Sequence, residues 1–274
     1  MNSSREQTRM STNKIPGMVL LLVCAAGAHA DVTITTITAG KASFIDVGGE
    51  GTNQIKGKRQ RSDQTILGRA RTLIIDIDNL RFVDVDANKK SATVTPLASI
   101  TRELAKVGVG SLQATLTKTA QTRSVAGYPC TVHDVKVTLP FSPTGKMGEG
   151  MDLDMVMSGT VCLGTTVPGI ADYQAFYKAA ADSGFIFGDP RTAKSPATAA
   201  QAKAYAALTR KMAEAGMALE SHITVSASGD GPLAGMMAKA VASDIRTTVT
   251  KIVAAELPAD AFDIPAGFQV KTKK

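Results

Sequence analysis

Few side chains in this sequence could perform covalent or metal chemistry. Beyond residue 30 the chain has two cysteines, Cys130 and Cys162, and two histidines, His133 and His222. Two cysteines at this separation can form a disulfide in an oxidising compartment, and the alternative is a pair of buried free thiols. In the chain-entropy account, closing a loop of this length adds roughly 3–4 kcal/mol of stability. We expect a Cys130–Cys162 disulfide.

The two histidines do not predict a catalytic site. Asp134 follows His133, but neighbouring residues of a strand point to opposite faces of a sheet, so the pair cannot act together. His222 stands at the start of a predicted strand, and no Gly-x-Ser-x-Gly turn occurs in the chain. We therefore expect no enzyme activity. A hydrolase that uses His133 or His222 is the third-ranked reading.

Two stretches imitate ligand-binding loops but lack the residues that define them. The stretch 84–88 resembles the start of a calcium loop, yet Lys89 takes the place of the glycine and Thr95 that of the closing glutamate. We expect a β-turn there. The stretch 145–150 lacks the Gly-Lys-Ser/Thr ending of a phosphate loop, and the spacing of cysteines and histidines is no zinc pattern. The sequence predicts no metal site and no cofactor.

Methionines provide the clearest sign of a binding site. Four of them lie within 147–157, and others follow at 212, 217, 236 and 237. Flexible thioethers suit an apolar cavity that adapts to its ligand, although ordinary core packing and Cu(I) binding are alternatives. The predicted lining of an apolar ligand site is Met151, Met155, Met157, Tyr205, Leu208 and Met212.

A basic run is the second candidate for a contact surface. It comprises Lys56, Lys58, Arg59 and Arg61 in a chain of net charge +7. These residues could attract anionic lipid headgroups at a membrane surface, and the alternative is a solvated strand face. Because no aromatic residues are interleaved with the basic ones, base stacking and nucleic-acid binding are not expected.

Residues 1–30 have the three parts of a secretory signal peptide. Three basic residues against one acidic residue precede an apolar run at 15–26, and Ala28-His29-Ala30 forms a cleavage site before Asp31. The apolar run is shorter than the ~20 residues that a membrane-spanning helix needs. We expect cleavage and export to the periplasm.

A lipoprotein is the other alternative for this N-terminus. Lipid attachment at Cys24 calls for a small residue before it, where the chain has Val23, so an outer-membrane lipoprotein is not favoured. Residues 1–30 carry three basic side chains and one acidic one, so removing them takes +2 from the total of +7 and leaves a mature chain, 31–274, at +5.

From residue 31 onward, the dominant pattern is the alternation of β-strands. Short connections favour an antiparallel sheet, and with no repeat or change in composition the range 31–274 is predicted to be a single domain. The run 48–51 is expected to be a flexible turn. About ten strands are predicted, at 32–37, 53–60, 72–76, 80–85, 92–95, 112–119, 131–139, 151–161, 223–227 and 245–253.

Three or four helices interrupt the strands, so the fold class is mainly β within α+β. Each predicted helix has one apolar face that would pack on the sheet. Proline after Thr95 or Ser195 is typical of a helix start, and Gly216 is typical of a helix end. The helices are predicted at 96–107, 171–183, 195–216 and 233–241, with 184–194 as the most flexible connection.

Three motifs carry a resemblance to a known family. They are Leu73–Asp76 within a strand–turn–strand, Gly127–Cys130 at the start of a strand, and Leu257–Phe268 near the end of the chain. Together they resemble an uncharacterised family of exported bacterial proteins that is similar to the periplasmic outer-membrane lipoprotein carriers. The resemblance implies a strongly curved antiparallel sheet, an unclosed β-barrel, with helices in its concave face. In the carriers this apolar hollow holds acyl chains.

The sequence departs from the carriers in two respects. It has no tryptophan, and it carries a long insertion around 185–200. No binding residue of the carriers maps onto this chain, so the resemblance implies a fold and a ligand class but assigns no site residue.

These observations predict a soluble periplasmic binding protein that holds a lipid or a lipoprotein acyl chain in a half-barrel hollow. Helix faces such as that of Leu208 and Met212 would cover the hollow and move aside for the ligand, driven by roughly 25 cal/mol for each Å² of apolar surface buried. The alternative is a structural or interaction protein of the cell envelope that docks a partner through a sheet edge or the basic strand.

Overall fold

A computed structural model describes residues 31–42, 45–66, 69–98, 113–141, 152–183, 196–230 and 234–273. The predicted signal peptide and the connection 184–194 lie outside these ranges. The strands of the described chain are β1 (Val32–Ala42), β2 (Ile45–Lys56), β3 (Arg59–Ile66), β4 (Arg69–Asp76), β5 (Arg81–Asp86), β6 (Ser91–Pro96), β7 (Gln113–Val125), β8 (Tyr128–Phe141), β9 (Asp152–Gly164), β10 (Met217–Asp230), β11 (Ser243–Ala254) and β12 (Gln269–Thr272). Its helices are α2 (Ile170–Asp182), α3 (Pro196–Ala215) and α4 (Ala234–Val241).

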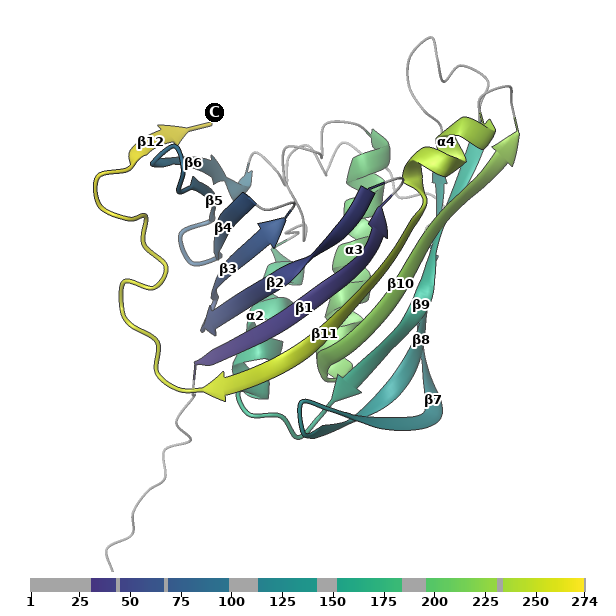
Figure 1. Cartoon of the computed structure of the whole chain (residues 1–274), viewed down its shortest axis with the longest axis horizontal. Helices are drawn as coiled ribbons and strands as arrows, with labels where there is room; N and C mark the ends of the chain where they lie inside the picture. Colours follow the sequence, from purple (N-terminus) through teal and green to yellow (C-terminus); the bar gives the residue numbers. More distant parts are fainter. Residues whose placement is uncertain are drawn as a thin grey trace, which may run out of the picture.

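All twelve strands belong to one sheet, which confirms the prediction of a mainly β, mostly antiparallel fold. The strand order is β12-β6-β5-β4-β3-β2-β1-β11-β10-β9-β8-β7. Neighbouring strands pair antiparallel except β12, which runs parallel to β6. β1 pairs with β11, so the first and the second-to-last strands meet in the middle of the sheet, whereas β12 lies at its edge (Figure 1).

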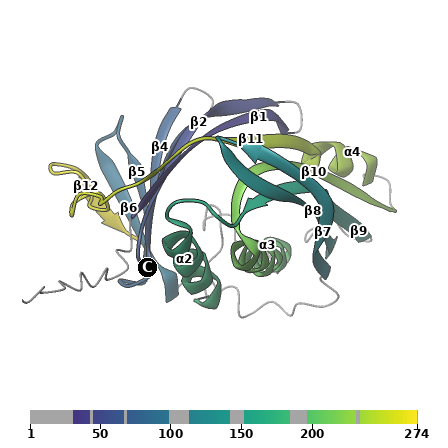
Figure 2. The same ribbon diagram turned by 90° about the horizontal axis from the view of Figure 1, so that it is seen from below.

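The sheet is strongly curved but not closed. Figure 2 shows it as an arch, with α2 and α3 in its concave face. The strands at its edges, β12 and β7, do not pair with each other. β9 and β10 approach closely at Gly159, where a Cβ would collide with the carbonyl oxygen of His222. A residue without a side chain allows the two backbones to approach at this point.

Two hydrophobic clusters fill the concave side. The larger one joins α2 to the middle strands and includes Val32, Ile55 and Phe176. α2 begins after Gly169, whose φ of 72° is left-handed, and a Cβ at Gly169 would clash with the side chain of Val32. This glycine therefore sets how closely α2 approaches β1. The smaller cluster lies between α3 and β7–β10 and includes Leu208.

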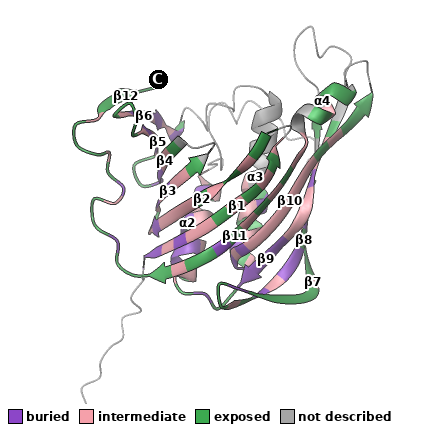
Figure 3. Cartoon of the chain, in the orientation of Figure 1, coloured by how far each residue is buried: buried purple, intermediate pink, exposed green. Residues whose placement is uncertain are grey.

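A third cluster lies on the outer face of β4–β6. Alternation assigns the faces: Ile75 and Phe82 belong to the inner cluster, whereas Ile74 and Val83 belong to the outer one. Residues 255–268, which we term the crossing segment, pass from the end of β11 toward β12 and cover the outer cluster with Phe262. Figure 3 shows buried residues on α2 and on the lower parts of β8 and β9, whereas β12 and several described residues of α4 are exposed.

One turn prediction and one strand prediction in the first half of the chain were wrong. The run 48–51, expected to be a flexible turn, lies within β2, where Gly48 pairs with Ala39 and Gly51 with Thr36. Glycine without a side chain can follow an extended, strongly bent strand as well as a turn. The polar stretch 53–60, expected to be one strand, is split between β2 and β3 by a turn at Gly57, where φ is 55°.

The other element predictions were largely confirmed. Helices predicted at 171–183, 195–216 and 233–241 correspond to α2, α3 and α4. The turn at 86–89 is present, and the Lys89 amide donates to the Asp86 carboxylate over 3.1 Å, so the calcium-like stretch is indeed a turn. Only the first two residues after β6, Leu97 and Ala98, are described as helical, and the rest of that predicted helix lies outside the described residues.

Candidate functional site beneath helix α3

The predicted apolar lining residues converge beneath α3. Met157 of β9 and Leu208 of α3 are each 4% exposed and belong to one cluster, against which Met155 and Met212 pack. The sequence therefore found four members of one packed group on two distant elements. Met151 lies outside the described residues. Tyr205 falls within α3, but its side chain is likewise outside what the structure describes.

Sequence reasoning missed the members of this group on β7, β8 and β10. Val135 and Val137 of β8 are buried in the same cluster, and Leu116, Ile223 and Val225 pack against it. The signal was present in the alternation of β8, where exposed Asp134 and Lys136 separate buried residues. We call the inward side chains of β7–β10 the apolar wall: Leu116, Val135, Val137, Met155, Met157 and Ile223.

α3 is held over the apolar wall by small side chains and a few polar contacts. Nine of its 20 residues are alanine, which buries far less apolar surface than leucine or methionine. Lys211 Nζ donates to the Ala114 carbonyl oxygen of the edge strand β7 over 3.2 Å. Arg210 forms an ion pair of 2.9 Å with Asp182 of α2. Gln174 of α2 also donates to the Ala213 carbonyl oxygen over 2.8 Å. The solvent-exposed ties among these contacts are individually weak.

Next to the larger hydrophobic cluster, the inner face of β1–β4 continues as a polar surface. Its inward side is identified by Gln60, whose Nε2 donates to the hydroxyl of Tyr177 in α2 over 3.3 Å. Alternation along β3 then places Ser62 and Gln64 inward as well, and Gln64 Nε2 donates to Ser62 Oγ over 2.8 Å. The register continues this surface onto the neighbouring strands. We call it the polar wall: Thr36, Thr38, Asn53, Ser62, Gln64 and Arg71.

The one cation named in the polar wall is already paired. Arg71 Nη2 and Nε lie 2.8 and 3.1 Å from the two carboxylate oxygens of Asp84. A two-point guanidinium–carboxylate pair of this kind holds both groups in fixed positions. The polar wall therefore presents hydroxyls and amides together with a charge pair that is neutral as a unit.

Buried tyrosines connect α2 to both sides of the concave face. Burial raises the pKa of Tyr173, and the backbone of Ala218 hydrogen-bonds its hydroxyl. Burial also raises the pKa of Tyr177, against the opposing effect of the hydrogen bond from Gln60. Both hydroxyls therefore remain neutral at physiological pH and act as fixed hydrogen-bonding groups.

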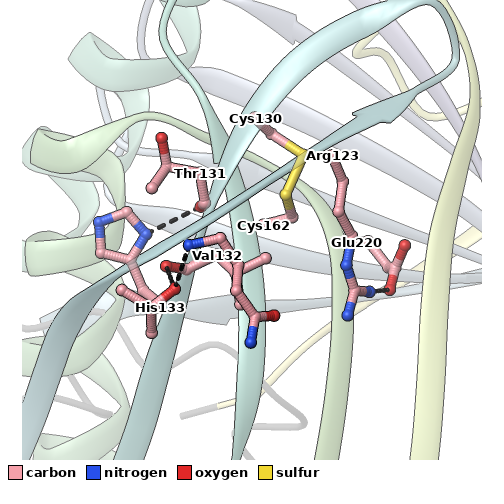
Figure 4. Close-up of a disulfide and its surroundings, with 9 residues drawn as sticks. Arg123, Cys130, Thr131, Val132, His133, Cys162 and Glu220 are labelled. Atoms are coloured by element: carbon pink, nitrogen blue, oxygen red, sulfur yellow. Dashed lines mark hydrogen bonds and ion pairs between the residues drawn. A yellow bond between two sulfur atoms is a disulfide. The ribbon is translucent and has the colours of Figure 1, made fainter.

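The predicted disulfide is present. Cys130 and Cys162, with Cα atoms 5.3 Å apart, join β8 to β9 (Figure 4). Arg123 forms an ion pair with Glu220 beside it. Disulfides persist in oxidising compartments, so this bond suggests a location outside the cytoplasm.

The two histidines lie in different surroundings. His133 is buried and points to the face of β8 opposite Cys130 (Figure 4), and its Nδ1–H donates to the Thr131 carbonyl oxygen over 3.0 Å. His222 Nε2 lies 2.8 Å from Asp244 Oδ1, and by register this pair is on the outer face. Among the described residues, the two cysteines are bonded to each other, and each histidine has a different partner: Thr131 for His133 and Asp244 for His222. Within the described ranges, no group of three His, Cys, Asp or Glu side chains could hold a metal ion.

Three of the four predicted basic contact residues bind the C-terminal part of the chain. Lys56 Nζ lies 2.8 Å from the Asp31 carboxylate and donates to the Leu257 carbonyl oxygen. Arg61 donates to the Ala261 carbonyl oxygen over 3.1 Å, and Arg59 lies over the ring of Phe262. Lys58 is more exposed and lies 3.9 Å from Asp78. This basic run thus holds the crossing segment against the sheet. Its contact with an anionic surface stays a prediction.

A shallow cavity of about 320 Å³ lies between β2, β3 and β4, away from α3. Its lining includes Glu50, Thr52 and Asp63. Asp63 already accepts two hydrogen bonds from Arg61 and one from the hydroxyl of Thr72. The Asp63 carboxylate therefore already has hydrogen-bond partners within the protein, so this cavity is a weaker candidate for a ligand site than the α3 interface.

Comparison with known proteins does not assign the chain to a family. No protein-family model matches it, and no curated protein matches it either. In the described part of the chain, no helix combines the length and the apolar character needed to cross a membrane.

Proposed function

We propose that this protein is a periplasmic binding protein, without catalysis of its own, that holds an acyl chain between α3 and the apolar wall. The fold proposed for it is that of the lipoprotein carriers, in keeping with the open, curved sheet and the helices in its concave face. The ligand would be a lipid or the acyl chain of a lipoprotein. The observation that carries the proposal is the convergence of Met155, Met157 and Met212 with Leu208 beneath an alanine-rich helix.

The mechanism is displacement. The cluster beneath α3 is packed, so an acyl chain enters by taking the place of the Leu208 and Met212 side chains against the sheet. Methionine has three rotatable bonds and adapts to a new neighbour at small cost. Each Å² of apolar surface that the chain buries contributes roughly 25 cal/mol, which offsets the loss of the few contacts of α3.

A single introduced tryptophan tests this proposal. The chain has no Trp, so emission from a Met212→Trp variant reports one position without background. The probe is palmitic acid brominated along its chain, since bromine quenches tryptophan emission only at close range. We expect saturable quenching, and unbrominated palmitic acid should compete for the site.

The matched control carries its tryptophan on the edge strand β12, as Val270→Trp. Val270 is 55% exposed and lies outside the concave face, so its emission should show no saturable quenching. Equal quenching of both variants, or no saturation with Met212→Trp, would mean that acyl chains do not enter beneath α3. Lipid mass spectrometry of protein purified gently from cells that export it then identifies the natural ligand.

A further inference from the structure

Outside the larger hydrophobic cluster, the concave face carries two surfaces of different polarity. The apolar wall on β7–β10 lies beneath α3, and the polar wall on β1–β4 lies on the other side of β11 in the strand order. A ligand that consists of a hydrocarbon chain alone would need only the apolar wall. We propose that the ligand is an amphiphile with an uncharged polar headgroup, its chain against the apolar wall and its headgroup against the polar wall. This inference rests on the proposed function and extends it to the headgroup.

The chemistry of the polar wall selects for hydrogen bonding rather than charge. Gln64 and Asn53 offer both donors and acceptors, and the hydroxyls of Thr36 and Ser62 can do either. These groups now bond within the wall: Thr36 Oγ1 donates to the Gly51 carbonyl oxygen, and Gln64 donates to Ser62. Hydroxyl or ester groups of a ligand can replace such contacts one for one.

A charged headgroup fits this wall less well. The guanidinium of Arg71 is engaged at two points by Asp84, so binding an anion there would break an existing pair. A cationic headgroup could bind Asp84 only by breaking the same pair with Arg71. Burying a charge without a partner is strongly unfavourable. Among ligands with the same chain, the neutral one should therefore bind most tightly.

Three ligands with one chain and different headgroups test the inference. They are monodecanoylglycerol, decanoic acid and decylamine, which is a cation at neutral pH. Each competes with brominated palmitic acid for the Met212→Trp protein. Because one good hydrogen bond contributes about 0.5–1.5 kcal/mol, monodecanoylglycerol should bind roughly 3- to 10-fold more tightly than the other two.

A pair of Gln→Leu variants in the Met212→Trp background assigns that preference to the polar wall. Gln64→Leu removes an inward amide and should abolish the preference for the neutral ligand while leaving the affinity for decanoic acid within about twofold. Gln54→Leu makes the same change in β2 on the outer face, where by register Gln54 lies beside Arg61, and should leave the preference intact.

The outcomes separate this inference from the proposed function. Equal displacement by all three ligands, or a preference that survives Gln64→Leu, would overturn the headgroup assignment and leave acyl-chain binding standing. Loss of the preference in both Gln→Leu variants would also overturn it, because the effect would then be unspecific. If brominated palmitic acid itself does not bind, the proposed function fails and the headgroup inference with it.

Discussion

The guanidinium carbon of Arg59 lies over the ring of Phe262, 4.9 Å from its centroid. Arg59 is at the start of β3, and Phe262 belongs to the crossing segment more than 200 residues later. Phe262 is 1% exposed and lies in the outer cluster with Ile74 and Val83. A basic strand and a C-terminal loop thus together close a hydrophobic core on the outer side of the sheet.

Phe262→Ala should therefore destabilise the protein by about 3–5 kcal/mol, because it removes a fully buried aromatic side chain and leaves a cavity. Arg59→Ala should cost only about 0.5–1 kcal/mol, since the stacked guanidinium is partly in solvent. Urea unfolding followed by circular dichroism measures both. A loss below 1 kcal/mol for Phe262→Ala would show that the crossing segment is not part of the folded core.

Replacing both cysteines, as Cys130→Ala with Cys162→Ala, should lower the free energy of unfolding by about 2–4 kcal/mol. The bond spans 32 residues and constrains the unfolded chain. The same loss is expected for the unaltered protein with dithiothreitol in the unfolding buffer. If reductant destabilises the double variant as much as the unaltered protein, the effect does not come from this bond.

Gly159→Ala should destabilise the protein by about 1–3 kcal/mol, because the new Cβ would collide with the His222 carbonyl oxygen and push β9 away from β10. Gly235 of α4 is the matched control, since a Cβ there would meet nothing within 4 Å. Alanine favours helices over glycine, so Gly235→Ala should be neutral or slightly stabilising. Thermal unfolding measured in parallel should give a lower melting temperature for Gly159→Ala and an unchanged or slightly higher one for Gly235→Ala.

Asp76 should make the stability depend on pH in acid. Burial raises its pKa, but hydrogen bonds from Asn79 and Arg81 outweigh burial and hold the pKa below the ordinary value of 3.8. The stabilisation is therefore complete above about pH 5 and is lost as the pH falls below 3.8 toward the pKa of the folded state.

Asp76→Asn removes this charge at nearly constant shape. At pH 7 it should cost about 1.5–3 kcal/mol, the usual range for hydrogen bonds to a charged group. Urea unfolding at pH 7 and at pH 3 compares the variant with the unaltered protein. The difference should shrink at the lower pH, and a difference that is the same at both pH values would refute the role assigned to the carboxylate.

The sequence was a good guide wherever a pattern was local. Alternation predicted most strands, and the proline after Ser195 marked where α3 begins. The two turns that join β4, β5 and β6 were predicted for the same reason. The pairing of Cys130 with Cys162 needed only the count of cysteines and an oxidising compartment.

Features that depend on distant contacts could not be predicted. The run 48–51 looked like a turn because glycine permits both a turn and a bent strand, and only the pairing partners decide between them. β12 is four residues long and all four are exposed, so no hydrophobic pattern marks it. The partners of the basic run lie some 200 residues downstream, and a linear pattern of charges cannot reveal them.

The candidate site shows the same division. Methionine spacing identified one part of the apolar wall, whereas the polar wall was missed because Ser62 and Gln64 alternate with charged residues, and a strand polar on both faces gives no sign of which face turns inward. The curvature of the sheet decides which face of such a strand is concave, and no local sequence pattern records that curvature.

The pairing of β1 with β11 has a consequence for biosynthesis. Val32 lies opposite Ala254, so the first strand has one partner that is made more than 200 residues after it. A ribosome or an export channel delivers the chain N-terminus first, so the edge of β1 that pairs with β11 stays open until Ser243–Ala254 have emerged. Contacts this far apart in sequence form slowly. β1 is therefore made early but completes its pairing late. Its open edge must be kept from pairing with other chains until β11 is available.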